Sequence, residues 1–182
     1  MTGAELMLGL ARGTQVAATM SVFGSMWFRV TLLAPAPVET ASPEVLSPQQ
    51  ALDRRLLRLT AISLVLAILA CLPWLLLQTV SLVDEPSVGE IGATLPIVLF
   101  ETHFGPLIGS RLALLLIAWL LSRRVKSRGA QGAATALAGS AVLLQIGLGH
   151  GLSMEDGTRT ALIIAEAGHL LSAAIWLGGL LP

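Results

Sequence analysis

Long apolar runs, separated by short polar segments, dominate the chain. A helix needs roughly 20 mostly apolar residues to cross the hydrocarbon core of a bilayer. Five segments reach this length, at about residues 4–34, 56–83, 104–122, 130–149 and 158–181. The pattern therefore predicts an all-α integral membrane protein, a polytopic helical bundle of about five transmembrane helices forming one domain over residues 1–182.

The segment 84–103, between the second and third predicted spans, carries a shorter apolar run. Its ten-residue core, from Ile91 to Phe100, is too short to cross a membrane. Pro96 lies inside this core and Pro106 follows it. We expect an outward-facing loop that contains a short interfacial or re-entrant segment.

The composition also indicates a membrane protein. Hydrophobic residues make up 54% of the chain and charged residues 12%, and the mean hydropathy is +0.80, whereas soluble domains carry about 25% charged residues. A net charge of zero gives no indication of a nucleic-acid partner. The single cysteine, Cys71, excludes an internal disulfide framework and a Cys-rich zinc site. The N-terminus lacks the basic region of a cleaved leader and carries Glu5, so we expect it to enter a spanning helix.

Basic residues determine the predicted orientation. Arg54, Arg55 and Arg58 lie between the first two spans, and four basic residues lie within 122–129, between the third and fourth. The other two loops are acidic, with Arg159 their only basic residue. The positive-inside rule places the two basic loops in the cytoplasm and the N-terminus and the acidic loops outside.

Four ionisable residues fall inside the predicted spans: Arg12, Arg111, Glu166 and His169. Such residues are costly in lipid and mark either a functional site or a buried pair. Glu166 and His169 lie three residues apart, on one face of a helix. Eleven residues from the outer end, His169 would lie roughly 16 Å deep.

This Glu-x-x-His pair has several chemical uses. The carboxylate of Glu166 can orient the imidazole of His169, share a cation with it, or pass a proton. The alternative is a hydrogen bond between helices, with Glu166 paired to Arg111 or Arg12. For the two arginines, a structural ion-pair role is at least as well supported as a functional one.

A second group of candidate ligands lies in the predicted outer loops. His150 and Met154 stand between the fourth and fifth spans beside two carboxylates, and His103 precedes the third span. Imidazole suits copper in either oxidation state, and a thioether favours Cu(I). These residues are candidate copper ligands, although a single His or Met in a loop is more often simply solvated.

The order of several short motifs resembles that of a known family. "GHG" at 149–151 is followed by Glu166, three residues before His169, and then by "HLLSAAIWLGGLLP". This arrangement is similar to that of the copper resistance protein D (CopD) family of bacterial inner-membrane proteins. The likeness covers most of the chain, and its most specific part is the last 35 residues.

Earlier segments resemble the same family. Thr102, Phe104 and Gly105 match its Thr-x-Phe-Gly pattern, which is followed by an arginine in the next helix, here Arg111. Matches to its first helix are Arg12, Gly24 and Phe28.

The resemblance implies a copper homeostasis protein that moves copper from the periplasm to the cytoplasm, often beside a periplasmic copper-binding partner of the CopC type. It makes His150, Glu166 and His169 the metal-linked positions. The family more often has Asp where Glu166 stands, a change that keeps the carboxylate. Family members also have more helices, so we expect this chain either to be truncated at its C-terminus or to lack the later helices.

Three functions remain as hypotheses. Copper binding and passage is the one we favour, with copper as the suspected ion and the lipid bilayer as the solvent. A b-type haem protein needs two histidines at one depth, whereas His150 and His169 differ by roughly 16 Å in helix rise. The third hypothesis is a scaffold subunit without ligand. The sequence contains no nucleophile–base constellation, phosphate loop or metalloprotease motif, so we do not expect an enzyme.

Overall fold

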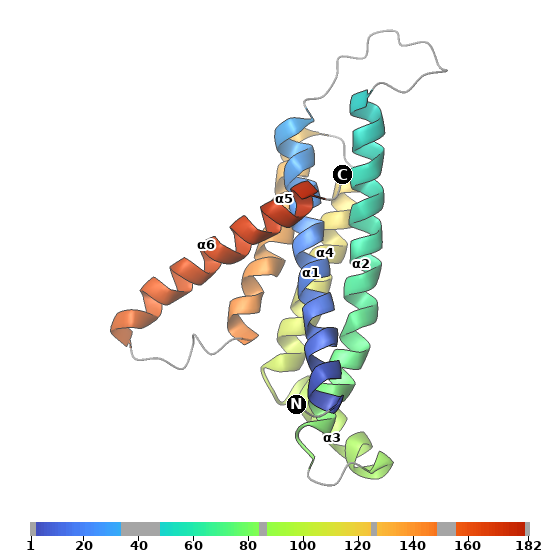
Figure 1. Ribbon diagram of the computed structural model, residues 1–182, viewed down its shortest axis with the longest axis vertical. Helices are drawn as coiled ribbons and strands as arrows, with labels where there is room; N and C mark the ends of the chain where they lie inside the picture. The colour runs from blue at the N-terminus through green and yellow to red at the C-terminus, as the bar shows by residue number, and fades with distance from the viewer. Residues whose placement is uncertain (1–2, 34–47, 84–86, 125–126, 149–155, 181–182) are drawn as a thin grey trace.

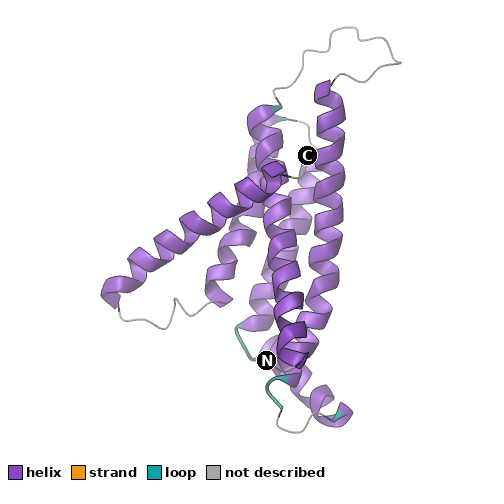
Figure 2. Ribbon diagram, in the orientation of Figure 1, coloured by secondary structure: helices purple, strands orange, loops and turns teal. Residues whose placement is uncertain are grey.

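The structure, a computed structural model, describes residues 3–33, 48–83, 87–124, 127–148 and 156–180. Figure 2 shows that these are helices joined to short loops, with no strand among them. This confirms the prediction of an all-α polytopic bundle. The helices are α1 (Gly3–Leu32), α2 (Pro48–Val80), α3 (Val88–Phe100), α4 (Phe104–Arg124), α5 (Arg128–Leu143), the short 3₁₀ helix η1 (Leu144–Leu148) that continues α5, and α6 (Asp156–Leu180).

The residues at which helices α2 and α3 begin are explained by the sequence around them. Helix α2 begins at Pro48, within the polar segment before the predicted span, because proline fits the first turn of a helix, where the missing N–H has no partner to lose. The apolar run after residue 87 forms the separate helix α3, whose first turn is capped by the Ser87 hydroxyl, 3.2 Å from the Glu90 N–H that it accepts. The interfacial or re-entrant placement of α3 stays a prediction.

Within the described residues, four helices are long and apolar enough to cross a membrane: α2, α4, the continuous segment Arg128–Leu148, and the Arg159–Leu180 part of α6. Helix α1 has 30 residues, a length of roughly 45 Å, but it is not among these four. Its buried face carries the polar residues Gln15, Thr19, Ser21 and Ser25, which lower its hydropathy. The polar residues of α1 therefore face other helices, because contact with lipid would be unfavourable for them.

Helices α1, α2, α4 and α5 run side by side and form a bundle (Figure 1). The N-terminal end of α1 lies near α3 at one end of this bundle. The end of α1, the start of α2, the end of α4 and the start of α5 lie at the other end. Both basic segments identified in the sequence therefore lie toward one end of the bundle, which is the arrangement that the positive-inside argument requires. The side of the membrane that this end faces stays a prediction.

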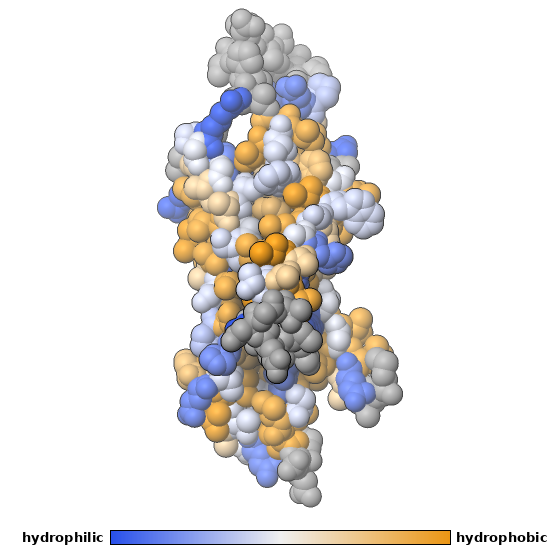
Figure 3. All heavy atoms as spheres, turned by 90° about the vertical axis from the view of Figure 1, so that its left-hand side faces the viewer, coloured by the Kyte–Doolittle hydropathy of each residue, from blue (hydrophilic) through white to orange (hydrophobic). Residues whose placement is uncertain are grey.

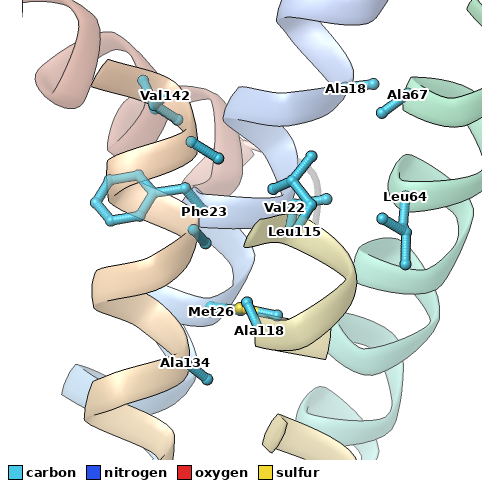
Figure 4. Packing of buried hydrophobic residues seen from close by; sticks show 13 residues of the cluster. Ala18, Val22, Phe23, Met26, Leu64, Ala67, Leu115, Ala118, Ala134 and Val142 are labelled. Atoms are coloured by element: carbon cyan, nitrogen blue, oxygen red, sulfur yellow. The ribbon is translucent and has the colours of Figure 1, made fainter. Parts of the chain in front are cut away.

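The centre of the bundle is a close-packed apolar cluster from all four helices (Figure 4). Val22 of α1 and Leu115 of α4 have no exposed surface. Alanines fill most of the remaining positions and let the helix backbones approach closely. They are Ala18, Ala67, Ala118, Ala134, Ala138 and Ala141 of the four bundle helices, and Ala174 of α6.

Helix α6 leaves this bundle at an angle (Figure 1). It contacts the bundle mainly through α1, at a crossing where two glycines meet. A Cβ atom on Gly24 would lie 2.8 Å from the Cα of Gly178 and would collide with the carbonyl oxygen of Ala174. From this crossing, the N-terminal half of α6 extends away from the other helices, and Ile164 on it is 66% exposed. Figure 3 shows that apolar residues cover much of the face on this side of the molecule.

Candidate functional site

Glu166 and His169 lie on the part of α6 that extends away from the bundle. Helix α6 is continuous from Asp156 to Leu180, so the two side chains lie one turn apart on one helix. Glu166 is half-buried and His169 is exposed. No hydrogen bond or ion pair joins either side chain to another described residue.

The alternative pairing of Glu166 with an arginine is not formed in the structure. Arg111 donates from Nη1 to Oε1 of Gln145 at 2.5 Å and from Nη2 to Oγ1 of Thr19 at 3.4 Å. Arg12 is exposed on the N-terminal part of α1. The structure therefore places Glu166 apart from both arginines.

Arg111 is instead the centre of a polar cluster inside the bundle. It is 1% exposed and is the largest fully buried side chain among the described residues. Thr19, which accepts its weaker hydrogen bond, donates in turn to the backbone carbonyl of Gln15 at 2.9 Å. Cys71 of α2 lies close to the Gln15 side chain and within electrostatic range of Arg111. We call Gln15, Thr19, Cys71, Arg111 and Gln145 the buried polar layer, because each helix of the bundle, with η1 extending α5, contributes to it.

Several polar atoms of the buried polar layer lack partners. Nε of Arg111 and both side-chain atoms of Gln15, Nε2 and Oε1, are buried and form no hydrogen bond with any described residue. The Gln15 amide lies near the Cys71 thiol without meeting hydrogen-bond geometry. Buried polar groups in native proteins are nearly always paired, so these unpaired atoms need an explanation.

Apolar residues enclose the buried polar layer on both sides along the bundle axis. Toward α3 lies a cluster that includes Trp74 and Ile108, in which the rings of Trp74 and Phe104 meet edge to face with centroids 5.1 Å apart. Toward the opposite end lies the central cluster that contains Val22 and Leu115. The polar side chains are thus surrounded by apolar ones rather than lining an open surface.

The predicted Thr-x-Phe-Gly motif forms the corner between α3 and α4. The Thr102 hydroxyl donates to the Val98 carbonyl at 2.7 Å and accepts from the Phe104 N–H at 3.2 Å, which ties the end of α3 to the start of α4. A Cβ on Gly105 would collide with the carbonyl oxygen of Leu99, so only glycine allows this close approach. The motif therefore has a structural role that positions α4 and Arg111.

The other candidate copper ligands, His103, His150 and Met154, lie outside α6. His103 is exposed, at the α3–α4 corner. His150 and Met154 lie outside the described residues. Among the residues that the structure describes, no group of three or more His, Cys, Asp or Glu side chains could hold a metal ion. The structure therefore keeps Glu166 and His169 together on α6 and brings no other described His, Cys, Asp or Glu to them as a metal group.

Two residues of the buried polar layer, Gln15 and Gln145, were missed by sequence reasoning that considered only ionisable groups. Each is a long amide in an otherwise apolar stretch, "GTQVAAT" and "VLLQIGL". An uncharged amide inside a predicted span is itself a signal, because in lipid it must find a partner on another helix.

The several helices long enough to span a bilayer, packed around a buried arginine, indicate a polytopic membrane protein. Comparison with protein families shows which family of membrane proteins it belongs to. The family model described as "Copper resistance protein D-like, N-terminal domain" matches residues 3–162. The chain therefore belongs to the copper resistance protein D-like family, a family of membrane copper-homeostasis proteins, as the sequence motifs predicted.

The matched segment covers the buried polar layer and ends four residues before Glu166. Comparison with curated proteins and with solved structures finds no match to either.

Proposed function

We propose that this copper resistance-related membrane protein binds copper and passes it across the bacterial inner membrane, with Glu166 and His169 as the binding position inside the bilayer. One observation carries the proposal. Helix α6 presents a carboxylate and an imidazole one turn apart within the spanning segment Arg159–Leu180, and neither has a partner among the described residues. Ionisable side chains at such a position are costly in lipid unless they serve a site.

Electrostatics favours α6 over the bundle interior as the place for a cation. Arg111 carries a permanent positive charge in the buried polar layer. At a separation of about 10 Å and an effective dielectric constant of about 20, two unit positive charges repel by about 1.7 kcal/mol, and a divalent ion doubles this. Glu166 supplies the opposite charge on α6, outside the bundle.

The ligand chemistry suits copper. The imidazole of His169 binds copper in both oxidation states, and the Glu166 carboxylate can contribute charge or orient the ring. His150, Met154 and His103 would collect the ion at the outer surface, where the Met154 thioether selects Cu(I). A periplasmic copper-binding protein of the CopC type would deliver it.

Copper stoichiometry and affinity, measured on the purified chain in detergent, test this proposal. Wild type should bind copper, and His169→Ala and Glu166→Gln should each weaken binding by about 10-fold or more, since loss of a ligand or of its supporting carboxylate costs this much. Ile164→Ala, an exposed position on the same helix, is the matched control and should leave the affinity unchanged.

Unchanged copper affinity in His169→Ala would show that α6 is not the site. An absorption spectrum of the same samples separates the other hypotheses: a Soret band would indicate haem, and colourless protein without copper would indicate a scaffold.

A further inference from the structure

The buried polar layer contains more positive charge than the described residues compensate. Arg111 is protonated at any physiological pH and is 1% exposed. Its hydrogen-bond partners, Gln145 and Thr19, are both neutral. No described carboxylate contacts it, and the charged side chain that acts on it electrostatically is another cation, Arg12. A buried guanidinium is stabilised when a negative charge lies beside it, because an uncompensated buried charge is costly.

The unpaired atoms indicate where that negative charge would lie. Nε of Arg111 and Nε2 of Gln15 are both buried N–H donors without an acceptor among the described residues. Gln15 has no exposed surface, and Arg111 donates to Thr19, which lies one helical turn from Gln15 and donates to its carbonyl, so the two free donors belong to one region of the layer. Two buried free donors in one region, one of them charged, are suited to an anion that accepts hydrogen bonds and donates none.

We propose that the buried polar layer binds one small monovalent anion of the halide class between the Arg111 guanidinium and the Gln15 amide. Apolar residues close the layer on both sides, including the Trp74–Phe104 ring pair, so the occupant must be compact and shed its water on entry. Bound there, the anion neutralises Arg111 and accepts from its Nε and from Nε2 of Gln15. The site is separate from the copper position on α6 and does not depend on it.

The test uses copper-free protein in detergent, so its result is independent of the proposed copper function. Thermal unfolding is followed while gluconate is replaced by chloride or bromide at constant ionic strength, and equilibrium dialysis with radiolabelled chloride gives the stoichiometry. We expect the midpoint to rise saturably with halide concentration, with one anion bound per chain. Acetate in place of chloride distinguishes a carboxylate from a halide, since a halide site should leave the midpoint unchanged with acetate.

Gln15→Met is the decisive variant, because it keeps the Arg111 charge and nearly the same side-chain shape but removes the amide donor. It should weaken chloride binding by about 10-fold or more, the usual worth of a hydrogen bond to a charged group. Gln78→Met, near the C-terminal end of α2, is the control: its amide makes no side-chain hydrogen bond to a described residue, and the variant should bind chloride as wild type does. The proposal is wrong if wild type shows no saturable halide binding, or if Gln15→Met binds chloride with wild-type affinity.

Discussion

The bundle of α1, α2, α4 and α5 and the outlying helix α6 are built from similarly apolar sequence but are packed very differently. In the apolar window of Arg128–Leu148, 44% of residues are buried, whereas in that of Arg159–Leu180 only 11% are. Helix α6 contributes one fully buried residue, Ala174, to the central apolar cluster, and its Leu170, Leu171 and Ile175 pack against the cluster while only partly buried. It is joined to the rest mainly by its crossing with α1 at Gly24 and Gly178.

The polar residues of the two regions also differ in how they contact the rest of the protein. In the bundle, Arg111 has found partners on other helices, and the interior is positive. On α6, Glu166 and His169 have no partner among the described residues. The buried polar side chain of Arg111 is thus held between helices of the bundle, whereas the two ionisable side chains of α6 form no contact of this kind with a described residue.

A substitution that disrupts the crossing between α1 and α6 should change the free energy of unfolding most. In Gly24→Leu the new side chain meets the backbone of Ala174 and Gly178, and backbone cannot move aside as a flexible side chain does. We expect a loss of about 3 kcal/mol in the free energy of unfolding, measured by denaturant titration in mixed micelles. Gly13→Leu on the same helix, where a Cβ meets nothing within 4 Å, controls for helix propensity and should cause no such loss. Equal losses in both variants would show that the crossing does not hold α6.

A pair of truncations compares the packing of the two regions directly. Leu115→Ala removes a side chain with no exposed surface from the central cluster and should cost about 2 kcal/mol, because a cavity remains even where lipid replaces water. Ile164→Ala on α6, at a position 66% exposed, should cost less than about 0.5 kcal/mol. The same micelle titration measures both, and comparable costs would mean that α6 is packed against protein.

The smallest expected effect concerns a hydrogen bond inside the bundle. Ser63 of α2 donates to Ser21 of α1 at 2.9 Å, and both side chains are buried. Ser63→Ala should lower the free energy of unfolding by about 0.6 kcal/mol, the average for such bonds between membrane helices. Ser110→Ala, at an exposed position of α4, is the control and should change nothing. If the two variants are indistinguishable, the bond between α1 and α2 does not contribute to the stability of the bundle.

Much of the fold was predictable because hydropathy is a local property of the sequence. The spans after residue 48 and the short helix near Pro96 follow from the lengths of apolar runs. Arg111 was identified as a charge inside a predicted span, but its hydrogen-bond partners Gln145 and Thr19 were not, because both are uncharged and come from distant parts of the chain. The alternative pairing of Glu166 with an arginine could not be decided for the same reason: sequence spacing gives the neighbours of a residue on its own helix and not those on other helices.

The sequence by itself determined that this is an all-α membrane protein of the copper resistance protein D-like family, since in lipid each spanning segment must satisfy its own backbone hydrogen bonds as a helix. Only the tertiary structure decided that Arg111 is enclosed by the bundle while Glu166 and His169 stand apart on α6. Helix packing in a membrane depends on close contact between small residues such as Gly24 and Gly178, and that contact requires the shapes of two helices together.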